Sequence, residues 1–183
     1  MLARMRLVSS VALSVLALGA ALPAQAFTAD HLFVGVTGGG VGMPVPGSLA
    51  TPTCDSFGNC GYPYFGSAIG GVEIGVDSDY GWQLRLHGFT VMPVPSAFDR
   101  LEGATLDLRY VIPTGGDRAF QPYLSIGGGA FGGSEQNSHF VGGIFELGFG
   151  ARYLFFDHLY VGGDAEWIDL YGGSVEGALG WEF

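Results

Sequence analysis

The sequence predicts an all-β protein: an eight-stranded, antiparallel, up-and-down transmembrane β-barrel that is preceded by a cleaved signal peptide. Three observations support this prediction. Apolar and polar residues alternate with a period of two over most of the chain after residue 30, which is the pattern of strands with one apolar face. Only 13% of the residues are charged, about half of the ~25% that is typical of soluble domains. Glycine is abundant, with 33 of 183 residues, and lysine does not occur.

Residues 1–26 have the pattern of a secretory signal peptide. Arg4 and Arg6 precede an apolar run from residue 7 to 22, and Ala24 and Ala26 supply small residues at the two positions that a signal peptidase reads. A run of this length is shorter than the ~20 residues that a membrane-spanning helix needs. We therefore expect cleavage after Ala26 and export to an oxidising compartment.

Residues 27–183 are expected to form one β-barrel domain with eight strands. The clearest segment places Leu84 and Leu86 on one face and Arg85 and His87 on the other. Segments of about ten residues match the ~9–11 that a tilted transmembrane strand needs. The predicted strands cover residues 31–42, 67–76, 82–90, 104–112, 120–131, 141–153, 159–167 and 175–183.

Alternation alone does not say which face of the strands meets water. A soluble lipocalin-like barrel, with the apolar face inside around a ligand, is the alternative. The polar face is rich in glycine and carries few charges, which suits a narrow eight-stranded interior better than a soluble exterior. Aromatic residues near strand ends favour lipid outside as well, since such residues form girdles at membrane interfaces. They are Trp82, Tyr110, Tyr153, Trp167 and Trp181.

Three stretches carry a resemblance to a known family. They are residues 121–129 (QPYLSIGGG), residues 148–153 (GFGARY) followed by 157–159 (DHL), and the alternating end of the chain with Trp181 and Phe183. They resemble the small OmpA/OmpX/OmpW-like outer-membrane β-barrel superfamily. The resemblance implies a Gram-negative-type outer membrane, both termini on the periplasmic side, and contact with outer-membrane lipid and lipopolysaccharide. It also implies that the last strand is the signal for the outer-membrane assembly machinery.

The lengths of the predicted connections agree with that orientation, because periplasmic turns are short and surface loops are longer. The expected periplasmic turns are 77–81, 113–119 and 154–157. The expected outer connections are two long loops at 43–66 and 91–103, an intermediate one at 132–138 and a tight turn at 171–173.

The polar face of the strands predicts a charged barrel interior, and sealed charges need partners. We expect Arg85, Arg109 and Arg152 to pair with carboxylates there. A filled, structural interior is one interpretation, and a narrow path for small cations is the other, because acids outnumber arginines. The predicted interior network is Glu73, Arg85, His87, Asp107, Arg109, Glu146, Arg152, Asp164, Glu166 and Glu176, with Glu182 on the same face.

Cys54 and Cys60 lie six residues apart in the longest predicted loop. In an exported chain such a pair is typical of a disulfide that restrains the loop. Two thiols without a nearby pair of histidines are too few for zinc. We expect neither a metal nor a cofactor.

The expected function is that of an integral outer-membrane barrel with a structural or surface-interaction role and no catalytic activity, whose surface ligand the sequence does not identify. A narrow pore is the first alternative, and a lipid A-modifying enzyme using Glu135, Ser138 and His139 is less favoured. The order Ser138-His139 does not match the His-before-Ser motif of lipid A deacylases. A formal net charge of -10 argues against nucleic acid as a partner.

Overall fold

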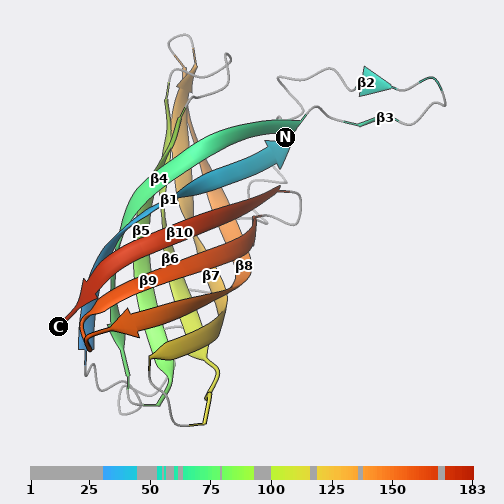
Figure 1. Ribbon diagram of the computed structural model, residues 1–183. Coiled ribbons are helices and arrows are strands. Elements are labelled where there is room, and N and C mark those ends of the chain that lie inside the picture. The colour runs from blue at the N-terminus through green and yellow to red at the C-terminus, as the bar shows by residue number, and fades with distance from the viewer. Residues whose placement is uncertain are drawn as a thin grey trace.

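In the computed structural model of the chain, the described residues are 31–44, 53–54, 56, 60–61, 64–78, 80–92, 100–115, 119–135, 138–168 and 172–183. The predicted signal peptide, residues 1–26, lies outside them. Eight long strands close into one antiparallel barrel in the order β1-β10-β9-β8-β7-β6-β5-β4 (Figure 1). They are β1 (His31–Pro44), β4 (Tyr64–Asp77), β5 (Trp82–Met92), β6 (Arg100–Val111), β7 (Phe120–Glu135), β8 (Ser138–Phe155), β9 (Leu159–Ile168) and β10 (Gly172–Glu182). The predicted eight-stranded, up-and-down all-β fold is confirmed.

The barrel closes where its first strand meets its last. β1 pairs with β10 from Phe33 opposite Glu182 to Gly42 opposite Gly173. Several strands are longer than the sequence pattern predicts, and β8 reaches 18 residues where the pattern predicts 141–153. The ladder continues past the end of the alternation because backbone hydrogen bonds need no particular side chain.

A second, small sheet was not predicted from the sequence. It consists of β2 (Thr53–Cys54) and β3 (Cys60–Gly61), which pair with each other and are separate from the barrel sheet. Cys54 stands directly opposite Cys60 in this pairing. The stretch predicted as one long loop therefore contains a hairpin.

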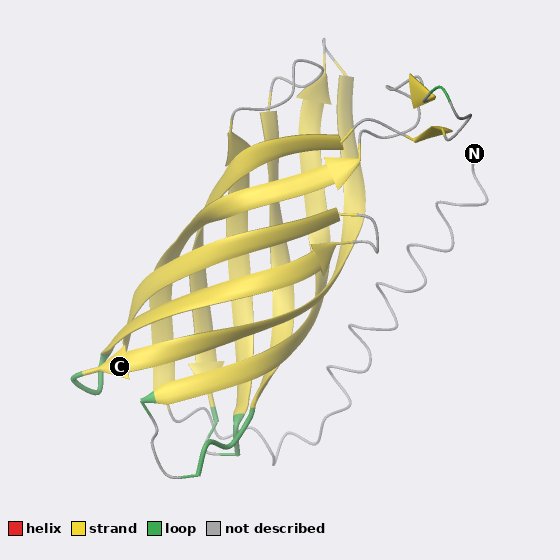
Figure 2. Ribbon diagram, turned by 45° about the vertical axis from the view of Figure 1, so that its right-hand side comes forward, coloured by secondary structure: helices red, strands yellow, loops and turns green. Residues whose placement is uncertain are grey.

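The two ends of the barrel differ. One end, called the turn end, carries the connections β4–β5, β6–β7 and β8–β9 together with the C-terminus, and the opposite end, the loop end, carries the others (Figure 2). The rim of the loop end is uneven. Glu146 of β8 pairs with Ile168 at the end of β9, so residues 138–145 of β8 extend beyond β9.

The outer face of the barrel is apolar. Leu86, Leu106, Leu147 and Val161 are among the large hydrophobic side chains that point outward and are 39–49% exposed. Such a continuous apolar exterior suits lipid and would be unusual on a soluble monomer. The arrangement is the reverse of the lipocalin-like alternative, whose exterior would be polar. Within the described part of the chain, no helix is long and apolar enough to cross a membrane.

Aromatic residues gather at the turn end, on the outside. The rings of Trp82 and Tyr110 are 4.9 Å apart, and those of Tyr153 and Phe155 are 4.7 Å apart. Trp181 stacks on His158 at 5.4 Å. Of the five aromatic residues predicted near strand ends, only Trp167 lies toward the loop end, because β9 runs in that direction. The aromatic residues around the turn end therefore have the position of an interfacial girdle.

The inside of the barrel has two zones. From the turn end to the middle it is polar and charged. Toward the loop end it is filled by an apolar plug, which the sequence analysis missed: six buried residues with Phe89 and Phe131 packed against them. A period of two identifies which residues face inward but not how the opposite walls fill the space between them. The six residues are Val41, Ile69, Val91, Leu101, Ile144 and Ile168.

Candidate functional site

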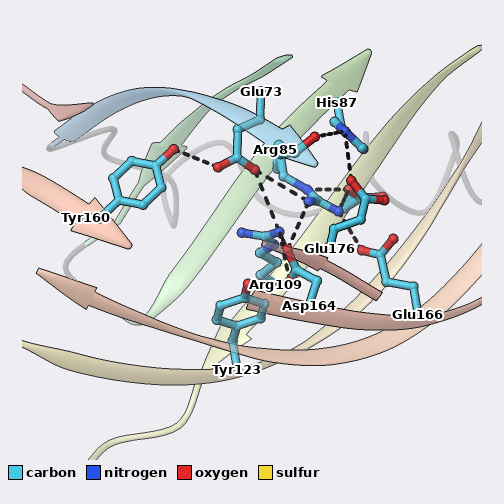
Figure 3. Close-up of polar contacts among 11 residues, drawn as sticks. Glu73, Arg85, His87, Arg109, Tyr123, Tyr160, Asp164, Glu166 and Glu176 are labelled. Carbon is cyan, nitrogen blue, oxygen red and sulfur yellow. Dashed lines mark hydrogen bonds and ion pairs between the residues drawn. The ribbon is translucent and has the colours of Figure 1, made fainter. Parts of the chain in front are cut away.

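The structure places all of the predicted interior charges inside the barrel, where each is less than 9% exposed. They come from six different strands, because each strand turns every second side chain inward. Arg85, on β5, lies at their centre (Figure 3). Its guanidinium group contacts carboxylates from three other strands, β4, β6 and β9.

The contacts of Arg85 are of two kinds. Nε lies 2.7 Å from Oδ2 of Asp107, and Nη2 lies 2.6 Å from Oε1 of Glu166. Nη1 makes longer contacts, 3.5 Å to Glu73 and 3.4 Å to Asp164. Short, charge-assisted bonds are about twice as strong as neutral ones. Arg85 is therefore held mainly between Asp107 on β6 and Glu166 on β9, across the barrel.

Arg109 forms a second centre nearer the turn end. Its Nη2 lies 3.1 Å from Oδ2 of Asp164, and its guanidinium carbon lies 4.3 Å from the centre of the Tyr123 ring. The Tyr123 hydroxyl donates a short hydrogen bond to Asp164. The Tyr160 hydroxyl donates to Oε1 of Glu73 at 2.6 Å on the opposite wall (Figure 3).

Arg152 organises the turn end of the lumen. Its Nη2 bonds Asp77 and lies 3.2 Å from Oε2 of Glu182, and its Nε donates to Gln121 at 2.9 Å. The guanidinium group also lies over the ring of Phe33 at 5.1 Å. Each of the three arginines therefore has at least one carboxylate partner.

A histidine forms the boundary between the charged zone and the plug. Nε2 of His87 lies 2.9 Å from the hydroxyl of Thr37 and 3.6 Å from Oε2 of Glu176. A cavity of about 20 Å³ lies next to His87, Glu146 and Glu176 and is otherwise lined mainly by the plug. That volume is about that of one water molecule.

Sequence reasoning missed the uncharged members of the network. Tyr123, Tyr160, Thr37 and Gln121 supply hydroxyl and amide groups to the charges. Tyr160 lies an even number of residues before Asp164 and Glu166 on the same strand, so it faces the same side. That spacing could have identified Tyr160 as an inward-facing residue. The partners themselves lie on other strands and cannot be identified from periodicity.

The arrangement balances charge across the barrel. The hydroxyl that lies beside an imidazole, that of Thr37 at 2.9 Å from Nε2 of His87, is buried between the charged zone and the plug. Ser138 and His139 are consecutive residues of β8. His139 is exposed. Ser138 stands opposite Glu135 in the backbone register of β7 and β8.

The chain was compared with protein families, with curated proteins and with solved structures, and only the solved structures gave matches. No protein-family model matches the sequence, and no curated protein matches it. Among solved structures, the N-terminal β-barrel domain of Pseudomonas aeruginosa OprF matches with a TM-score of 0.57 at 16% identity, covering 84% of this chain and 98% of that one. Neisserial surface protein A matches with a TM-score of 0.52 at 10% identity, covering 83% and 94%.

Both of these are eight-stranded outer-membrane barrels. The likeness covers nearly all of each matched chain and extends to strand number and closure. With an apolar exterior and a charged interior, the chain thus has the fold of the small OmpA-like outer-membrane β-barrels, and the fold agrees with the expected outer-membrane localisation.

Proposed function

We propose that the chain is a non-catalytic integral outer-membrane protein whose barrel is a rigid, closed support for segments displayed at the cell surface. The observation that carries this proposal is the filled lumen. Charged groups bonded across the barrel occupy one zone and the apolar plug occupies the other. A lumen of this kind holds the strands in place and leaves little room for a solute.

The alternative of a narrow cation path has one observation in its favour. Eight buried carboxylates face three buried arginines in the described interior. The plug opposes this alternative, because an ion would have to pass apolar side chains without partners. Planar-bilayer recordings of the purified protein decide between the two. We expect no conductance steps, and cation-selective steps would overturn the closed-support proposal.

The proposed orientation places the loop end outside the cell and the C-terminus in the periplasm. An epitope inserted in the chain between β1 and β2, after Gly47, should then be labelled by antibody on intact cells. The same epitope inserted after Gly115, at the turn end, is the matched control and should be labelled only after permeabilisation. The opposite labelling pattern would overturn the orientation.

The outer surface of the barrel would take part in assembly and in contact with lipid. Trp181 and Phe183 point outward at the end of the last strand, where the assembly machinery would recognise them. Lipid and lipopolysaccharide would contact the apolar outer face. We expect Phe183→Ala to lower the amount of protein in the outer-membrane fraction several-fold, with periplasmic degradation, and an unchanged amount would argue against the signal.

A further inference from the structure

Three carboxylates converge at one point of the charged interior. Asp107 on β6, Glu146 on β8 and Glu166 on β9 each place an oxygen within 4.8 Å of the other two. All three side chains are buried, at 1%, 5% and 6% exposure. Like charges at this distance repel strongly in a low-dielectric interior. Something positive must lie among them, or they must share protons.

Two glycines allow the carboxylates to approach one another. Gly127 lies on β7 between Asp107 and Glu146, and a Cβ atom there would overlap Oδ1 of Asp107. Gly148 lies on β8 opposite Glu166, and a Cβ atom there would lie 2.8 Å from Cγ of Glu166. Asp107 therefore leans over β7, and Glu166 leans over β8. The strand surface is hollowed where the carboxylates meet.

The arginine at the centre of the network does not complete this cluster. Arg85 bonds Oδ2 of Asp107 and Oε1 of Glu166. Oδ1 of Asp107 and Oε2 of Glu146 are buried without a hydrogen-bond partner among the described residues. Burying an acceptor without a partner destabilises the fold, and more so when the acceptor is charged.

A fourth oxygen, outside the acidic cluster, points to the same place. Thr105 lies two residues before Asp107 on the inward face of β6 and is 1% exposed. Its hydroxyl interacts with the carboxylate of Glu146 but is not in hydrogen-bond geometry with any described residue. The cavity of about 20 Å³ also borders Glu146, on the side of the plug.

We infer that Asp107, Glu146 and Glu166 bind one divalent metal cation of the hard, oxygen-preferring class, for which Ca²⁺ is the best fit. Calcium takes oxygen ligands at about 2.3–2.6 Å, so the oxygens around one ion lie up to about 5 Å apart. The spacing of the three carboxylates meets this limit. Thr105 and a water in the neighbouring cavity would add ligands. The charge of the ion would offset part of the excess of eight carboxylates over three arginines.

The test is calcium binding by the refolded full-length protein. The protein in a non-ionic detergent is treated with EDTA, freed of it, and equilibrated with Ca²⁺ or, in a second arm, with Mg²⁺. Bound metal is measured by inductively coupled plasma mass spectrometry, and unfolding temperature is followed in the same samples. We expect about one calcium per chain and a higher unfolding temperature with Ca²⁺ than with EDTA.

Two isosteric variants give the comparison. Glu146→Gln removes one ligand charge and should weaken calcium binding at least ~10–100-fold. Mutation of a residue that only hydrogen-bonds to a metal ligand already lowers metal affinity by that factor. Glu182→Gln removes another buried carboxylate, near Arg152 and away from the cluster, and should bind calcium as the wild type does. If Glu146→Gln does not fold, the stoichiometry of the wild type decides alone.

The outcomes that would overturn the inference are distinct. Wild-type protein without bound metal, and with the same unfolding temperature in Ca²⁺ and EDTA, would mean that the carboxylates share protons instead. Equal loss of calcium in Glu146→Gln and Glu182→Gln would mean diffuse attraction to a negative lumen. Binding of Mg²⁺ in preference to Ca²⁺ would overturn the assignment to calcium.

Discussion

The charged zone and the apolar plug occupy the same kind of position and are held together by different forces. Both are made of inward-facing side chains, and several strands contribute to both: β8 contributes Glu146 to the first and Ile144 to the second. Contacts in the charged zone are directional and join particular atoms, such as Nη2 of Arg85 and Oε1 of Glu166 at 2.6 Å. Contacts in the plug depend only on shape and apolar area.

The two zones therefore have different roles in the barrel. A hydrogen-bonded charge pair tolerates little displacement, so the network opposes slippage of one strand against the next. The plug tolerates small shifts and excludes water from the loop end of the lumen. Exclusion of water in turn strengthens the charge pairs beneath it, since electrostatic interactions grow as the local dielectric constant falls.

The largest effect should come from the centre of the charged zone. Arg85→Met keeps most of the side-chain volume and leaves the carboxylates of Asp107 and Glu166 without their cation. Removing one partner of a buried ion pair typically costs about 3–5 kcal/mol. Reversible urea unfolding from liposomes, with gel mobility before and after boiling, measures the change. A variant as stable as the wild type would show that the network contributes nothing to barrel stability.

The next prediction concerns the opposite face of the wall. Leu147 follows Glu146 on β8 and points to lipid near the middle of that strand. Leu147→Arg should cost about 2–4 kcal/mol in the same assay, the range for a cation near the bilayer midplane. Leu147→Ala is the control and should cost much less, because lipid fills the space. If the arginine is tolerated as well as the alanine, this face does not meet the bilayer core.

A smaller effect is expected in the plug. Ile144→Ala leaves a cavity among the plug residues and should cost about 2 kcal/mol, the lower end of the range for buried isoleucine, because the plug is deformable. Ile126→Ala removes the same atoms from a side chain that is 44% exposed on the outer face, against 7% for Ile144. We expect liposome unfolding to separate the two variants, and equal losses would contradict a packed plug.

The smallest effect on the barrel should come from the β2–β3 hairpin. Residues opposite each other in an antiparallel pair have Cα atoms about 4.5–5.5 Å apart, which suits a disulfide between Cys54 and Cys60. We expect both thiols to resist alkylation in protein purified without reductant. Cys54→Ser should leave the unfolding free energy of the barrel unchanged within about 0.5 kcal/mol, as for surface changes in general. Alkylation of both cysteines without reductant would contradict the disulfide.

Periodicity was enough to predict the eight strands and the inward position of their charged residues. Arg85, Arg109 and Glu146 alternate with apolar neighbours, and that alternation is a local property of the chain. The partners of these residues could not be predicted, because Arg85 and Glu166 are 81 residues apart and meet only across the lumen. The convergence of Asp107 and Glu146 was equally hidden, since it depends on how Gly127 lies between them.

The plug was missed for a different reason. Ile144 and Ile168 face the lumen like the charged residues two positions away on their strands, but they are apolar like the residues that face lipid. In a short apolar stretch near a strand end, residues on both faces are apolar, so polarity alone does not separate the lumen from the lipid side. The closed barrel resolves the ambiguity, because the outward positions of these strands are already occupied by residues such as Leu147 and Trp167.

The long sequence separation of the ion pairs has a consequence for how the protein enters a membrane. Arg85 bonds residues from β4, β6 and β9, so its partners come together only when the sheet has curled nearly to closure. A single hairpin such as β4–β5 would present Glu73 and Arg85 to hydrocarbon on one side. We therefore expect that the hairpins do not insert one after another. The inner face must stay in contact with water or with another protein until β10 meets β1.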